Sequence, residues 1–152
     1  MCKIALVSMP VCMLQYPSIS LTQLKSVAKQ KHGDRVSIDV YQLNHDFAAF
    51  MGLRSQNGNG SDEPLWEEFF DDTLMHATGL GDWLFRHVAV PDAEDNPDYY
   101  FARYYDGRKD EAALQALKAR RPKLEAFLEG LIDEYGLDQA DIVGFASMFQ
   151  QT

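Results

Sequence analysis

The feature that most constrains the fold is a short apolar run near the N-terminus, IALV at residues 4–7, which no polar residue interrupts. Such a run is typical of a strand that is buried on both faces of a parallel sheet. Apolar residues then recur at helical spacing over residues 21–28, and Gly33 stands where a helix C-cap glycine belongs. Residues 36–41 alternate between apolar and polar, as in a half-buried strand. These segments predict a right-handed βαβ unit with parallel strands.

A second fully apolar run, IVGFA at residues 142–146, predicts a third strand. Two helices are predicted before it, over residues 110–120 and 122–135, because the proline at their junction is tolerated only near a helix start. Together the elements predict an α/β fold. It is a Rossmann-like parallel sheet in the flavodoxin-like order, flanked by helices, with a helical and loop insertion between strands 2 and 3 over residues 45–110.

The chain has 152 residues, enough for one domain with a real core and not enough for two. The order 2-1-3 leaves the apolar third strand at an edge, and an unpaired apolar edge strand is an aggregation liability. We therefore expect residues 1–152 to be a single Rossmann-like domain truncated after the third strand, as the front part of something longer, or a domain whose edge another chain covers. The alternative is a small three-stranded α/β protein whose middle segment covers the edge.

The composition excludes several classes of partner. A formal net charge of −9 argues against nucleic acid or an anionic membrane, because both attract a basic surface. The short basic cluster at residues 120–123 is predicted to be a solvated helix turn rather than an anion site. No apolar run approaches the roughly 18 to 20 residues that span a bilayer, and the N-terminus lacks the shape of a secretory signal. Two cysteines cannot make a disulfide framework, so we expect a cytoplasmic protein with reduced thiols.

Position in the fold predicts one binding site. Ligands of open parallel sheets bind outside the carboxyl ends of the strands, where the strand order reverses. In the order 2-1-3 that point is flanked by the loops at residues 9–18 and 147–152. Both loops are rich in groups that can contact a flat, amide-bearing ligand: Gln15, Tyr16, Ser18, Ser147, Gln150 and Gln151. The alternative is that Pro10, Tyr16 and Pro17 merely shape a tight loop.

Familiar cofactor and metal motifs are missing from the sequence. Neither loop carries G-x-G-x-x-G or G-x-x-x-x-G-K-[ST], the usual phosphate cradles. The four histidines are isolated, without Cys-x-x-Cys or His-Glu-x-x-His spacing. Cys12 lies in the first loop, where a thiol can be reactive, but a small packing residue is the preferred interpretation because no base accompanies it. An unrelated flavodoxin-like enzyme that uses Cys12 remains one alternative.

Three segments together carry a resemblance to a known family. They are KIALVSMPVCMLQYPSISLTQLK at residues 3–25, GDWLF at residues 81–85 and DIVGFASMFQQ at residues 141–151. In order and spacing they resemble the start of the radical SAM proteins that mature ribosomally made peptides, often described as peptide C-methyltransferases. The N-terminal region of that family is similar to the cobalamin-binding domains of other radical SAM methyltransferases. The resemblance spans essentially the whole chain.

The resemblance implies a Rossmann-like module that holds cobalamin at the carboxyl edge of its sheet. The implied function is that of an N-terminal domain, not catalytic alone, of an enzyme that C-methylates or otherwise matures a bacteriocin-type peptide. The implied partners are the precursor peptide and the radical SAM catalytic domain, and S-adenosylmethionine and a 4Fe-4S cluster would bind only in the latter. The implied cobalamin-binding residues lie in the two loops: Met9, Pro10, Gln15, Tyr16, Pro17, Ser18, Ser147, Gln150 and Gln151.

Two departures from the family pattern limit what this chain holds. A radical SAM cluster needs three cysteine thiolates, and only Cys2 and Cys12 are present. We therefore expect no catalytic residue and no metal ligand here, and a catalytic barrel C-terminal to residue 152. The Asp-x-His-x-x-Gly motif that ligates cobalt through histidine is also absent, so cobalamin would lack that lower ligand. The alternative function is a cofactor-free module that docks the precursor peptide or the catalytic partner.

Overall fold

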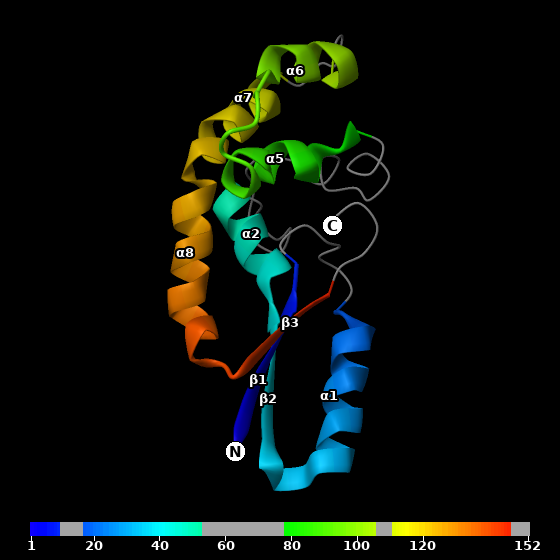
Figure 1. The fold of residues 1–152 in the computed structure, drawn as a ribbon. Helices are drawn as coiled ribbons and strands as arrows, with labels where there is room; N and C mark the ends of the chain where they lie inside the picture. The colour runs from blue at the N-terminus through cyan, green and yellow to red at the C-terminus, as the bar shows by residue number, and fades with distance from the viewer. Residues whose placement is uncertain (10–16, 53–77, 106–110, 147–152) are drawn as a thin grey trace.

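The computed structural model describes residues 1–9, 17–52, 78–105 and 111–146 (Figure 1). The strands (β), α-helices (α) and 3-10 turns (η) follow one another as β1 (Cys2–Ser8), α1 (Ile19–His32), η1 (Gly33–Arg35), β2 (Val36–Gln42), α2 (Leu43–Met51), α5 (Leu80–Ala89), α6 (Pro97–Tyr105), α7 (Glu111–Arg120), η2 (Arg121–Lys123), α8 (Leu124–Tyr135), η3 (Leu137–Gln139) and β3 (Ile142–Ala146).

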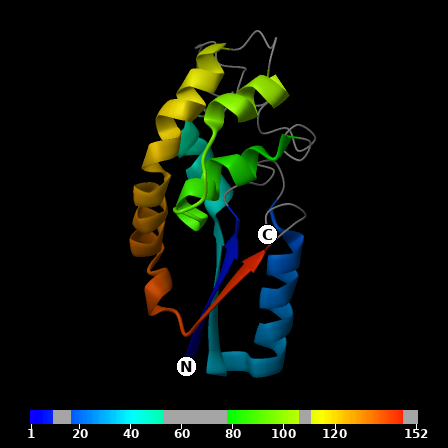
Figure 2. The same cartoon turned by 45° about the horizontal axis from the view of Figure 1, so that its top comes forward.

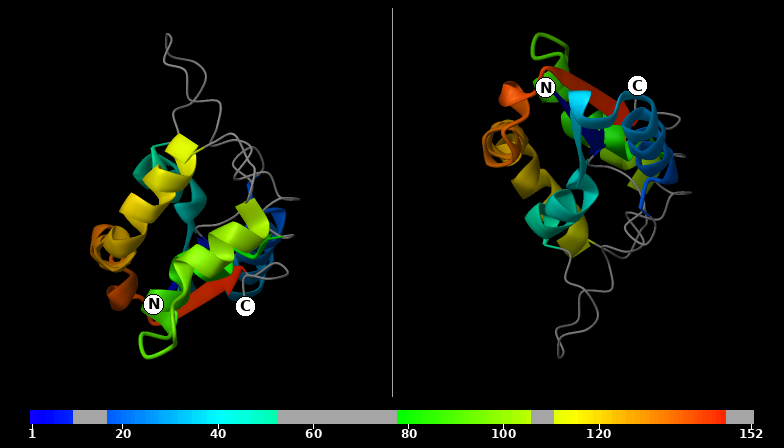
Figure 3. Two further views of the ribbon diagram at one scale, coloured as in Figure 1. Left: turned by 90° about the horizontal axis from the view of Figure 1, so that it is seen from above. Right: turned by 90° about the horizontal axis from the view of Figure 1, so that it is seen from below.

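The three strands form one parallel sheet in the order β2-β1-β3. Helix α1 covers one face of this sheet and α8 the other, as the views along the strands in Figure 3 show. The predicted α/β architecture is therefore confirmed: an open parallel sheet flanked by helices, with further helices between β2 and β3. The β1–α1–β2 connection is right-handed, as expected for parallel strands joined by a helix.

Alternate residues of the strands belong to two separate hydrophobic cores, one on each face of the sheet. On the α1 face, Leu6 of β1 packs with Ile38 of β2 and with Leu21 of α1. On the α8 face, Val7 of β1 packs with Leu131 of α8. Both faces of β1 are thus buried, which explains why residues 4–7 are apolar without alternation.

A third core lies in the helical insertion, beyond the carboxyl ends of the strands (Figures 1 and 2). Phe47 and Met51 of α2 and Leu84 of α5 are fully buried there, together with Leu124 at the start of α8. Helix α8 is shared, because Leu131 near its other end belongs to the core under the sheet and Phe127 packs against both cores.

Local signals set most helix ends where the sequence predicts them. The expected boundary between two C-terminal helices is the turn η2, which contains Pro122 at a position where the missing N–H does no harm. Gly136 ends α8 in the left-handed conformation, with φ of 57°. Helix α2 begins at Leu43, directly after β2, and the GDWLF segment is part of α5.

One expectation for this region is wrong. The basic cluster at residues 120–123 is not simply a solvated turn, because Arg121 is buried. Its guanidinium lies 4.3 Å from the centre of the Trp83 ring, and its Nε donates to the Trp83 carbonyl oxygen at 3.0 Å. Both terminal nitrogens of Arg121 donate to the carboxylate of Asp95. Arg121 therefore ties α5 and the segment after it to the start of α8.

Replacing Gly52 by alanine should destabilise the protein, whereas Gly130→Ala should stabilise it. Gly52 ends α2 with φ of 85°, and a Cβ there would lie 2.5 Å from Nη2 of Arg120. We expect a loss of about 1–3 kcal/mol. Gly130 lies inside α8 with no atom within 4 Å of its added Cβ, so alanine should add up to about 1 kcal/mol through helix propensity. Urea unfolding of both variants tests this, and shifts of the same sign would contradict it.

Candidate functional site

The carboxyl edge of the sheet brings the two predicted loops to adjacent strands. Ser8, the last residue of β1, pairs in register with Ala146, the last residue of β3. The chain therefore leaves the sheet at neighbouring points toward residues 9–18 and 147–152. Among the nine predicted site residues, the structure describes Met9, Pro17 and Ser18. The other six, Pro10, Gln15, Tyr16, Ser147, Gln150 and Gln151, lie outside the described residues.

Ser18 has a structural role at this edge. Its Oγ accepts a hydrogen bond from the backbone N–H of Leu21 at 3.4 Å, and its carbonyl oxygen accepts one from the Thr22 hydroxyl at 3.1 Å. Ser18 is thus the N-cap of α1, and serine is one of the residue types that are most favourable at this position. Pro17, immediately before it, is exposed, and Met9 is half-buried.

The described residues at the ends of β1 and β3 and at the start of α1 are uncharged. Ser8, Met9, Pro17, Ser18 and Ala146 carry no charge, and the first turn of α1 has no acidic side chain. Within the described residues, the first turn of α1 thus places no carboxylate of its own at the positive end of the helix dipole. The described groups here are neutral hydroxyl, thioether and backbone groups, which can contact an uncharged ligand surface.

The GDWLF segment does not lie in the carboxyl-edge loops. Trp83 and Leu84 are buried in the core of the insertion, and Asp82 is exposed. Trp83 stacks on Tyr100 with ring centres 5.3 Å apart, and the guanidinium of Arg121 also lies over its ring. The buried side chains of this segment are therefore part of the hydrophobic core of the insertion.

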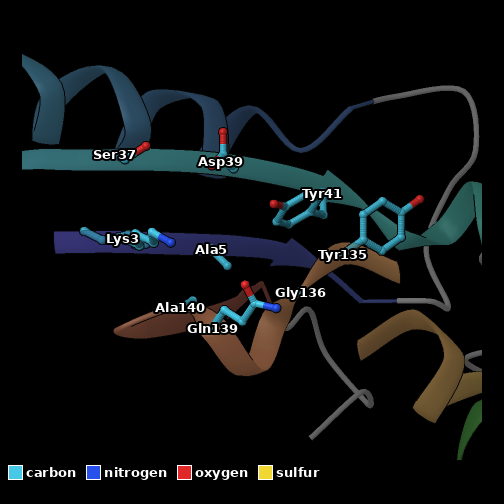
Figure 4. A pocket seen from close by; sticks show the side chains of 10 residues that line it. Lys3, Ala5, Ser37, Asp39, Tyr41, Tyr135, Gly136, Gln139 and Ala140 are labelled. Atoms are coloured by element: carbon cyan, nitrogen blue, oxygen red, sulfur yellow. The ribbon is translucent and has the colours of Figure 1, made fainter. Parts of the chain in front are cut away.

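A second concave feature, which the sequence reasoning missed, lies on the α8 face of the sheet (Figure 4). It is an open hollow of about 240 Å³ beside β2. Its polar lining comes from Lys3, Ser37, Asp39, Tyr41, Tyr135 and Gln139. The alternation at residues 36–41 was the available signal, because it marks one face of β2 as polar.

Two tyrosines form one end of this hollow. The rings of Tyr41 and Tyr135 lie 4.9 Å apart, and the Tyr135 hydroxyl donates to the carboxylate of Asp46, 3.0 Å from each oxygen. Burial, followed by the hydrogen bond to Asp46, raises the pKa of Tyr135 to about 12. The tyrosine therefore links the end of α8 to the first turn of α2 in its protonated form.

This raised pKa predicts a loss of stability in alkali. An unfolded tyrosine ionises near pH 10, whereas folded Tyr135 keeps its proton to about pH 12. Between these values only the unfolded state loses the proton, so the free energy of unfolding should fall as the pH rises. Tyr135→Phe should show a smaller fall between pH 10 and 12 in urea titrations. Equal slopes for the two proteins would contradict the assignment.

The described residues contain no group of three or more His, Cys, Asp or Glu side chains placed to hold a metal ion. Within the same part of the chain, no helix is both long and apolar enough to cross a membrane. Comparison of the sequence with protein-family models and curated proteins, and of the fold with solved structures, finds no match.

Proposed function

We propose that this chain is the N-terminal, cobalamin-binding-like domain of a radical SAM enzyme that C-methylates or otherwise matures a ribosomally synthesised, bacteriocin-type peptide. The observation that supports this most is the register pair of Ser8 and Ala146 at the carboxyl edge of the sheet. It brings together the two segments in which the resemblance to this family is most specific. The domain is not catalytic alone.

The chemistry of the edge agrees with this proposal. Strands β1 and β3 are neighbours, and no strand separates the loops that follow them. Cobalamin, when bound, supplies the methyl group that such enzymes transfer. The task of this chain is to bind and orient the cofactor through the nine residues of the two loops, with α1 fixed at the edge by its Ser18 cap. The catalytic domain, with S-adenosylmethionine and the 4Fe-4S cluster, and the precursor peptide are the proposed partners, and the proposed compartment is the cytoplasm.

Titration with hydroxocobalamin tests the proposal. We expect saturable binding of one cofactor per chain, detected as induced circular dichroism in the visible corrin bands. Tyr16→Ala and Gln151→Ala should weaken binding about tenfold or more, which corresponds to the loss of a contact of about 1.4 kcal/mol. Gln139→Ala, in the hollow on the sheet face, is the matched control and should bind like the parent. Absence of binding by a folded chain, or equal loss in the control, would exclude this site.

A second candidate is a cofactor-free module that docks the precursor peptide or the catalytic partner. The exposed apolar edge of β3 favours it, because Phe145 is exposed there rather than buried. The two functions are separable, since only the first requires a spectral change with hydroxocobalamin.

A further inference from the structure

Among the described residues, nothing pairs with one edge of strand β3, which is called the open edge below. Its only partner in the described part of the chain is β1, and Figure 1 looks toward its other side. Ile142 is 54% exposed and Phe145 61% exposed, although both belong to an otherwise apolar strand. Sheet edges are normally protected by charged residues, prolines, bulges or a covering element. Residues 142–146 contain no charge and no proline, whereas the opposite edge strand, β2, carries Asp39.

The register identifies which backbone groups face the open edge. The backbone N–H of Lys3 donates to the Asp141 carboxylate at 2.7 Å, and the Lys3 carbonyl oxygen accepts from the Asp141 backbone N–H at 2.9 Å. Both backbone groups of Lys3 therefore point toward the β3 side. Alternation along β1 then turns Ala5 toward β3 as well. Ala5 is in register with Val143, so its bonds reach the residues on either side of Val143. The N–H and C=O groups of Val143 and Phe145 consequently point to the open edge.

Apolar surface continues from this edge onto both faces of the sheet. Val143 packs in the core on the α8 face and Ala146 in the core on the α1 face, so the alternation of the strand places Phe145 on the α8 face and Ile142 on the α1 face. On α1, Leu24 and Val27 are 53% and 59% exposed, and they flank the side of the helix that Leu21 and Ala28 bury. Because the β1–α1–β2 connection is right-handed, this flank of α1 is turned toward the β3 side.

From these three features we propose that the open edge of β3 docks the edge of another α/β layer, which adds an uncharged strand to β3. Helices of that layer cover Phe145 on one face and Leu24, Val27 and Ile142 on the other. A lone extended peptide would satisfy the backbone groups of Val143 and Phe145 and leave the apolar side chains exposed on both faces.

A second copy of this chain fits the surface less well. Helix α1 packs mainly over β1 and β2. With strands about 4.8 Å apart, edge-to-edge pairing of two copies would separate their α1 axes by roughly 20 Å. Packed helices lie about 8–10 Å apart, so a gap would remain above Ile142. The docking inference is independent of cobalamin, because it uses no residue of the two loops.

Amide exchange by NMR tests the backbone part of the proposal. In the chain itself, the amides of Val143 and Phe145 should exchange much faster than that of Gly144, which faces β1. A probe strand is then attached after residue 152 through a flexible linker of about fifteen residues, long enough for a parallel return. The probe has the sequence IALVS, because residues 4–8 already pair with β3 on its other side. It should slow exchange at Val143 and Phe145 by about tenfold or more.

Two controls make the outcome decisive. A probe with prolines at alternate positions, and the Phe145→Lys variant with the original probe, should leave Val143 unprotected. No protection by the original probe would overturn the proposal. The proposal would also be overturned if the unextended chain formed dimers that the Phe145→Lys variant did not form, because a second copy would then occupy the edge. Soluble nitroxide should still relax the methyl groups of Leu24 and Val27 when the probe is bound. Complete shielding by the strand alone would mean that a simple peptide, not a folded layer, is the occupant.

Discussion

Replacement of Phe47 by alanine is expected to lower the free energy of unfolding by about 3–5 kcal/mol. Phe47 is fully buried where α2 meets α5 and α8. Its ring centre lies 5.6 Å from that of Phe85 and 6.1 Å from that of Phe127. Alanine leaves a cavity bounded by rigid rings, which cannot collapse to fill it. Domains of this size are stable by about 5–15 kcal/mol in total, so the loss is a large share.

Urea unfolding followed by circular dichroism measures the effect. Tyr99→Ala is the matched control, because Tyr99 is another large aromatic residue but is largely exposed. It should change the free energy of unfolding by no more than about 0.5 kcal/mol. If Phe47→Ala were as mild as Tyr99→Ala, the insertion would lack the packed core described above.

The second large effect is expected at Arg121. Arg121→Ala removes the cation above the Trp83 ring and the donor to the Trp83 carbonyl oxygen, and it leaves Asp95 without its partner. We expect a loss of about 2–4 kcal/mol. Arg121→Lys should recover only part of this, because an ammonium group cannot reproduce the planar fork that bonds to Asp95.

The contribution of the ion pair can be separated from that of the stack. Asp95→Asn keeps a hydrogen-bonding side chain and leaves the Arg121–Trp83 contact in place. Because Asp95 is partly exposed, this variant should lose only about 1 kcal/mol. Arg121→Ala and Asp95→Asn are compared by urea unfolding at neutral pH. Equal losses would show that the carboxylate, rather than the stack on Trp83, accounts for the role of Arg121.

The sheet could be predicted because its signals are local. Residues 4–7 are apolar on both faces, and the structure buries both faces of β1. The proline in η2 and Gly136 after α8 act through their own backbone restrictions, so their effect does not depend on distant residues. The strand order also followed, because a right-handed connection leaves few topologies for short parallel strands.

The burial of Arg121 could not be predicted in this way. A run of basic residues after a helix looks the same whether it is solvated or not. The partners that bury Arg121 are Asp95, 26 positions away, and Trp83, 38 positions away. Only the tertiary structure brings them together. The hollow beside β2 is similar, since Lys3 and Gln139 reach it from opposite ends of the chain.

The position of the candidate carboxyl-edge site could be predicted only in part from the sequence. The topological rule places the loops after β1 and β3 at one edge, but it does not give their register. That register, Ser8 with Ala146, comes from the strand pairing. The capping role of Ser18 was also missed, although a serine directly before an apolar-periodic segment is a familiar helix start.

The sharing of α8 between two cores has a consequence for how the molecule unfolds. Its first residue, Leu124, is buried in the insertion, and Leu131, two turns later, is buried beneath the sheet. A helix of this kind is a stiff rod, with about 1.5 Å between successive residues. The insertion cannot open around Leu124 without also loosening the cover over Val7. We therefore expect the sheet and the insertion to unfold together as one cooperative unit.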